Sequence, residues 1–153
     1  MNAVSPMPAL PPHRLSIVVP MYQEEDSVAP FVARVSECLA LYPHPWELLL
    51  VNDGSRDGTR SAIEKAQHEY GPHIRLIELA RNYKQTAAMQ AGIDHARGDV
   101  IATLDGDLQN DPVDIPAWWP VCFSKTSIWS PDGDKTVKAH WSCANCLRAS
   151  PTA

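Results

Sequence analysis

Short apolar runs alternate with helical segments along the chain, and this alternation constrains the fold more than any other feature. Four runs have the apolar or β-branched composition of buried strands, at residues 15–20, 47–52, 74–79 and 100–104. Each is separated from the next by a segment with helical spacing. A repeated strand–helix order predicts a parallel sheet with helices on both faces and right-handed crossovers. We therefore predict an α/β fold.

The predicted helices carry signals for where they begin. The first has apolar residues three and four positions apart, at Val28, Phe31, Val32, Val35 and Leu39. Asp26 or Ser27 is placed to cap this helix, and Asp57 with Thr59 to cap the second. The third is expected over about residues 85–97.

Polar residues follow all four predicted strands where each strand ends. In chain order they are Tyr22 and Glu24, Asp53 and Gly54, Arg81 and Asn82, and Asp105 and Asp107. Ligands of open α/β sheets bind outside the carboxyl ends of the strands. A single such ending is ordinary loop composition, but four at one edge favour a ligand site.

Two carboxylates one residue apart follow the last strand, in the segment IATLDGDLQNDP at residues 101–112. Like charges this close repel and raise one pKa of the pair. A divalent cation removes that repulsion, and hard oxygen ligands suit magnesium or manganese, which usually bring substrate phosphates. The alternative is an acidic turn that closes a strand.

The motifs that are missing narrow the choice of ligand. The sequence has neither the dinucleotide fingerprint G-x-G-x-x-G nor the phosphate loop that ends in Gly-Lys-Ser/Thr. A metal on Asp107 would have to neutralise a diphosphate instead, which indicates a nucleotide-diphosphate substrate rather than a hydride cofactor. Asp53 can accept hydrogen bonds from a base edge, or it can be a turn residue before Gly54.

Four ordered motifs carry a resemblance to a known family. SIVVPMYQEEDSV, LLLVNDGSRDGT, LARNYKQTAAMQAGIDHARGD and IATLDGDLQNDP resemble the amino-terminal half of family 2 glycosyltransferases. The most similar subgroup is the dolichol- and polyprenyl-phosphate sugar transferases. The resemblance covers roughly residues 14–116 and implies the Rossmann-like GT-A fold with a parallel sheet core, here incomplete at its carboxyl end.

By that resemblance, each matching residue has an expected role. Pro20, Tyr22 and Glu24 would line the nucleotide pocket, and Asp53 would bind the base. Asp105 would lie by the ribose and the diphosphate, and Arg81 and Lys84 would lie near the diphosphate. Asp107 and Gln109 would bind Mg²⁺ or Mn²⁺. Lys84 departs from the pattern, since many relatives have glycine there.

The resemblance also implies a reaction and its partners. A sugar would pass from a UDP- or GDP-linked donor, with inversion, to a polyprenyl or dolichyl phosphate or another lipid or glycan acceptor. A lipid phosphate is already ionised and needs no strong base, whereas a hydroxyl acceptor would need one. The sequence shows no candidate base, because Asp111 and Asp114 are expected at a turn and a helix start.

Composition excludes other classes of protein. A net charge of -5 with no basic run argues against a nucleic-acid binder. No apolar stretch approaches the ~20 residues of a membrane span. Residues 1–14 are proline-rich and are expected to form a flexible arm without the features of a signal peptide, so we expect a cytoplasmic location, with relatives often at the membrane face, and reduced cysteines.

The pattern of apolar and polar residues changes after residue 116. The segment 117–153 has no helical or strand periodicity, and we expect it to be disordered. A zinc site from Cys122, His140, Cys143 and Cys146 has little support, because there is no second C-x-x-C. Back-translation with GC-rich codons, read one frame over from Ala117, restores family-like stretches such as GWR and RKLPSRIAN. We therefore interpret the tail as a frameshift product.

The sequence supports three hypotheses about function. The first is a glycosyltransferase of which this chain holds the donor-nucleotide half, with little or no turnover of its own. The second is a non-catalytic fragment that binds a nucleotide diphosphate. The third, a nucleotidyltransferase, would normally have a glycine-rich basic loop after its first strand, whereas this chain has the acidic PMYQEEDS.

Overall fold

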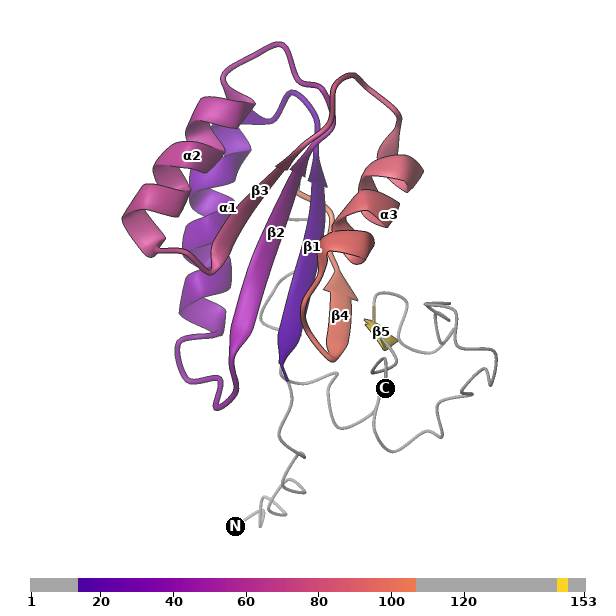
Figure 1. The fold of residues 1–153 in the computed structure, drawn as a ribbon. Coiled ribbons are helices and arrows are strands. Elements are labelled where there is room, and N and C mark those ends of the chain that lie inside the picture. The colour runs from indigo at the N-terminus through magenta and orange to yellow at the C-terminus, as the bar shows by residue number, and fades with distance from the viewer. Residues whose placement is uncertain (1–13, 107–145, 149–153) are drawn as a thin grey trace, which may run out of the picture.

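The computed structural model describes residues 14–106 and 146–148 of the chain. The elements in order are β1 (Leu15–Met21), α1 (Glu25–Cys38), β2 (Trp46–Asn52), α2 (Thr59–Tyr70), β3 (Ile74–Glu78), α3 (Gln85–His95), β4 (Val100–Thr103) and β5 (Cys146–Arg148) (Figure 1). The predicted strands and helices are all present. The arm before residue 14 and most of the predicted tail lie outside the described residues.

The strands form one sheet in the order β3-β2-β1-β4-β5. β1 pairs in parallel with β2 on one side and with β4 on the other, and β2 pairs in parallel with β3. The chain therefore builds outward from β1 to β3 and then crosses to the opposite side of β1. This reversal creates a topological switch point between β1 and β4, where open α/β sheets bind ligands.

β5 adds an antiparallel edge to this sheet. Its three residues pair with β4, with Leu147 opposite Ile101. These residues fall within the segment predicted to be disordered, and the rest of that segment lies outside the described residues. The edge of β4 that faces away from β1 is thus paired along Val100–Ala102.

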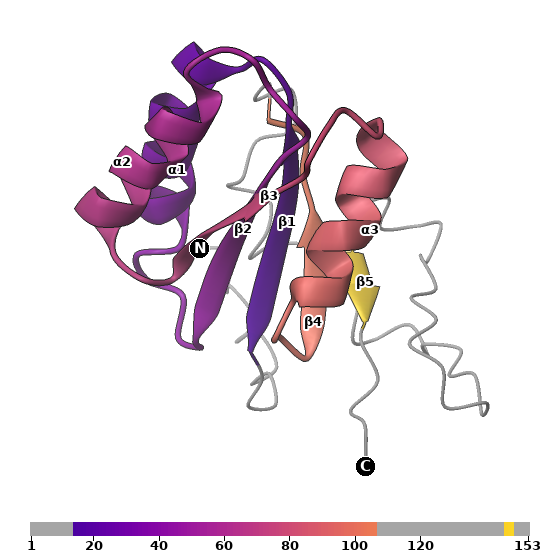
Figure 2. The ribbon, with the colours of Figure 1, turned by 45° about the horizontal axis from the view of Figure 1, so that its top comes forward.

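Helices cover both faces of the sheet, as predicted. α1 and α2 lie side by side on one face and α3 lies alone on the other (Figures 1 and 2). The side chains of β1 alternate between the two faces of the sheet. Ile17 and Val19 pack in the core under α1 and α2, and Val18 packs in the smaller core under α3. This period of two is what a strand buried on both faces requires.

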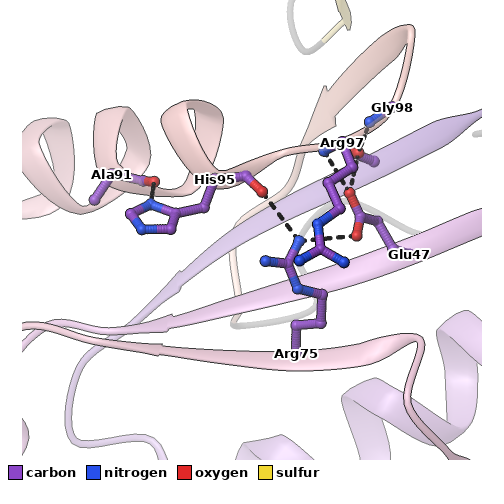
Figure 3. A network of polar contacts seen from close by, with 7 residues as sticks. Glu47, Arg75, Ala91, His95, Arg97 and Gly98 are labelled. Carbon is purple, nitrogen blue, oxygen red and sulfur yellow. Dashed lines mark hydrogen bonds and ion pairs between the residues drawn. The ribbon is translucent and has the colours of Figure 1, made fainter.

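A buried carboxylate ties the amino edge of the sheet together (Figure 3). Glu47 of β2 is 1% exposed and accepts hydrogen bonds from Ser16 Oγ (2.7 Å), the Arg97 backbone N–H (2.7 Å) and the Arg75 guanidinium (2.9 Å). Arg75 also donates to the carbonyl of His95. Burial by itself raises the pKa of Glu47, but the hydrogen bonds and the charge of Arg75 outweigh it and lower the pKa below its usual value.

The structure corrects the predicted caps of α1 and α2. α1 begins at Glu25 with Glu24 at the N-cap, so neither Asp26 nor Ser27 caps it. α2 begins at Thr59 itself, after Gly58. Gly58 is the N-cap, and Asp57, one residue before it, accepts the first amide of α2 through Oδ1 at 3.1 Å. Within the described part of the chain, no helix combines the length and the apolar character that a membrane span requires.

Candidate functional site

The loops that follow β1, β2 and β3 lie at the carboxyl edge of the sheet, toward the top of the view in Figure 1, and residues 104–106 follow β4 at the same edge. All four parallel strands point the same way, so their loops meet there. Every predicted site residue that the structure describes lies on these loops or at a strand end: Pro20, Tyr22, Glu24, Asp53, Arg81, Lys84 and Asp105. We call this region the carboxyl-edge site.

Asp53 is the most buried member of the site, at 3% exposed. Its backbone N–H donates to the carbonyl of Met21, which anchors it to the end of β1. Its side-chain Oδ1 accepts the backbone N–H of Tyr83 at 2.8 Å. Asp53 was alternatively expected to be only a turn residue before Gly54. Its carboxylate instead also holds the β3–α3 loop.

Gly54 lets the same loop approach β2. Its φ of +67° lies in the region that favours glycine, and a Cβ there would overlap the backbone of Arg81 and Asn82. The sequence Asp53-Gly54 thus supplies a carboxylate that binds the loop and a space that the loop fills.

Asp105 lies half-buried just past β4 and meets the start of α3. Its Oδ1 accepts a hydrogen bond from Gln85 Nε2 at 2.8 Å. The next residue, Gly106, is buried, and a side chain there would overlap the Glu24 carboxyl group and the sulfur of Met21. The ends of β1 and β4 are therefore packed together at the switch point.

Hydrogen bonds also join the loops after β1 and β2. The Gln23 N–H donates to Ser55 Oγ (2.9 Å) and the Glu24 N–H to Thr59 Oγ1 (3.0 Å). The Thr59 hydroxyl in turn donates to Asp57, and this bond lowers the pKa of Asp57 below its usual value. Thr59 is thus buried as a bridge between loops, in place of the predicted N-cap role.

The exposed part of the site is aromatic and cationic. The Tyr22 and Tyr83 side chains are 45% and 44% exposed, and Arg81 and Lys84 are exposed as well. The Arg81 guanidinium lies over the Tyr83 ring, 4.9 Å from its centroid. Lys84 has φ +77° and ψ +163°, a combination found essentially only in glycine.

The predicted metal ligands cannot be placed. Asp107 and Gln109 lie outside the described residues. Within residues 14–106 and 146–148, no group of three or more His, Cys, Asp or Glu side chains could hold a metal ion. Asp105 is the described carboxylate nearest in sequence to the predicted ligands.

Sequence reasoning missed the residues that hold the site together. Tyr83 acts through its backbone N–H, which no side-chain pattern reveals, and Gln85 reads as an ordinary first residue of a helix. The close approach of Gly106 to Glu24 depends on the strand order. In the sequence, the only signal of this close approach was the glycine between Asp105 and Asp107.

Comparison with known proteins decides the family. Residues 16–120 match the family model described as glycosyl transferase family 2. The chain belongs to this family. Over 103 residues it is 58% identical to a dodecaprenyl-phosphate galacturonate synthase of Rhizobium johnstonii, a match covering 67% of this chain and 30% of that protein. Over 104 residues it is 43% identical to an undecaprenyl-phosphate 4-deoxy-4-formamido-L-arabinose transferase of Enterobacter sp., covering 68% and 32%.

The family fold is also found among solved structures. A mannosyltransferase from Pyrobaculum calidifontis, solved in complex with GDP-Man and Mn²⁺, matches with a TM-score of 0.54 and 24% identity over 68% of this chain and 31% of that one. A mycobacterial protein matches with a TM-score of 0.58 and 20% identity over 74% and 38%. The predicted GT-A fold of family 2 glycosyltransferases is confirmed. The chain spans about a third of the length of the curated relatives above.

Proposed function

We propose that this chain is the donor-binding part of a family 2 glycosyltransferase that moves a sugar from a nucleotide diphosphate to a polyprenyl phosphate. The names of both curated relatives contain a polyprenyl phosphate, which supports this acceptor class and a place at a membrane. We propose that this place is the cytoplasmic face. Neither name identifies the sugar that this chain would transfer, since the two relatives are named for different sugars.

The observation that carries the proposal is the pair of carboxylates, Asp53 after β2 and Asp105 after β4, held at the carboxyl edge of the sheet. Asp53 keeps one oxygen on the Tyr83 N–H, and a carboxylate has a second oxygen that can accept from a base N–H. Asp105 lies across the same loop, where the ribose and the diphosphate would follow the base. Both positions agree with the roles that family resemblance implies.

Charge at the site suits a diphosphate. The exposed Arg81 and Lys84 lie on the loop that joins the two carboxylates, where their positive charges would face the phosphates. Pro20, Tyr22 and Glu24 would border the nucleotide from the end of β1. An exposed tyrosine offers a flat surface against which a base can pack.

Oxygen ligands after β4 suit a divalent cation. We propose Asp107 and Gln109, two and four residues after Asp105 in the sequence, as ligands for Mg²⁺ or Mn²⁺. A bound ion would offset the negative charge that develops on the departing diphosphate. The acceptor phosphate is already anionic, so attack on the anomeric carbon from the opposite side, with inversion, needs no strong base from this chain.

Isothermal titration calorimetry with UDP and GDP, with and without Mn²⁺, tests this proposal. We expect binding to one nucleotide that requires the metal and weakens at least about tenfold in Asp107→Ala and in Asp53→Asn. Asp99→Asn is the matched control, because that exposed carboxylate accepts the Arg14 N–H at the amino edge. A folded sample that binds neither nucleotide would overturn the proposal.

The second candidate is a nucleotide-binding fragment without transferase activity. The chain covers about a third of its curated relatives, which favours this candidate for the isolated chain. A transfer assay with a polyprenyl phosphate separates the two. Metal-dependent binding without any transfer would support the fragment, and turnover would exclude it.

A further inference from the structure

Gln85 makes a side-chain contact that the predicted site does not include. It is the first residue of α3, and its Nε2 donates to Asp105 Oδ1 at 2.8 Å. The two residues are 20 positions apart and come from different elements. The contact therefore exists only because α3 begins beside the end of β4.

The loop before Gln85 is fixed at several points. The Tyr83 N–H is bound by Asp53, and the Lys84 N–H donates to Asn82 Oδ1 at 3.2 Å. The Lys84 carbonyl accepts the N–H of Ala88 as α3 begins. Lys84 is held in its glycine-like conformation between these contacts. Gln85 is thereby placed by the same loop that Asp53 holds.

The chemistry of the contact suits the orientation of a carboxylate. An amide N–H on Oδ1 fixes the rotation of the Asp105 side chain and leaves Oδ2 as an acceptor for a ligand hydroxyl. The amide is neutral, so it does not neutralise the carboxylate as a lysine or arginine would. We propose that Gln85 is a positioning residue that orients Asp105 toward the bound nucleotide; this inference rests on the proposed function.

Gln85→Met tests the inference, because methionine keeps the length and helix preference of glutamine and removes its N–H donor. The matched control is Gln90→Met, since Gln90 also lies on α3 and donates to an aspartate, Asp94, at 2.9 Å. Calorimetry with UDP or GDP and Mn²⁺ would compare both variants with the wild-type chain.

We expect Gln85→Met to weaken nucleotide binding about five- to tenfold, as the loss of one such hydrogen bond implies, and to leave the unfolding transition as close to wild type as Gln90→Met does. A purely structural role would shift the unfolding transition and not the affinity. Equal affinity of Gln85→Met and wild type would overturn the inference alone. Absence of binding by wild type would overturn the proposed function and the inference with it.

The contact has its own readout without any nucleotide. In ¹⁵N spectra, Asp105→Asn should displace the side-chain amide signals of Gln85 and leave those of Gln90 in place. Unmoved Gln85 signals would overturn the inference, whatever the calorimetry gives.

Discussion

Lys84 occupies a backbone conformation that few residues other than glycine adopt, with φ +77° and ψ +163°. Glycine can adopt it without a clash between Cβ and the backbone. We expect Lys84→Gly to raise the free energy of unfolding by about 1 kcal/mol, measured by urea denaturation. We also expect it to weaken nucleotide binding several-fold, because a cation near the diphosphate is lost.

Lys65→Gly is the control for this prediction. Lys65 is an exposed lysine in the middle of α2, where glycine should lower the free energy of unfolding by about 1 kcal/mol. Opposite signs for the two substitutions are expected. If both lower stability, the backbone at Lys84 is not strained.

At the scale of residues, the sequence predicted the positions of the site residues better than it predicted which residues they contact. Asp53 and Asp105 lie where their motifs put them, at strand ends, because a buried apolar run fixes where its strand stops. Their partners, Tyr83 in the β3–α3 loop and Gln85 at the start of α3, are far away in the sequence, and only the packed fold brings them together. The glycine-like backbone of Lys84 was visible solely as a departure from the family pattern.

At the scale of elements, the network of Glu47 connects β1, β2, β3 and the turn before β4. Glu47→Gln leaves one carbonyl oxygen for several donors and points an NH₂ toward Arg75. We expect it to lower the free energy of unfolding at pH 7 by about 2–3 kcal/mol, measured by urea denaturation.

The same network predicts a dependence on pH. The folded-state pKa of Glu47 lies below its ordinary value of 4.5, so the stabilisation is fully present above pH 4.5 and is lost as the pH falls through the folded value. The difference between wild type and Glu47→Gln should shrink over that interval. Glu78→Gln, which breaks an ion pair with Arg60 at the surface, should change stability little at either pH. A constant difference between wild type and Glu47→Gln would contradict this account.

The strand positions and the start of α3 at Gln85 were predictable, whereas the start of α1 was not. Each predicted strand overlaps the observed one because β-branched runs need burial on both faces. The start of α1 moved upstream to Glu25, and Thr59 became a bridge, because the loops after β1 and β2 bind each other. A local capping pattern contains no information about such a contact.

At the scale of the whole molecule, the parallel order was predictable and the strand order was not. Composition and periodicity predict four parallel strands, whereas the position of β4 beside β1 depends on which crossover the chain takes. That position creates the switch point and hence the site. The interpretation of residues 117–153 as a frameshift product stays a prediction, and the gene sequence around the Ala117 codon would test it.

The central claim is that the carboxyl edge of this sheet binds a nucleotide diphosphate. The most direct measurement is a ¹⁵N spectrum of the whole chain titrated with UDP or GDP in the presence of Mg²⁺. We predict that backbone signals of Tyr22, Asp53, Tyr83 and Asp105 shift together and saturate, while those of Glu47 and Arg97 at the amino edge stay in place. Shifts at the amino edge, or none from a folded sample, would contradict the account.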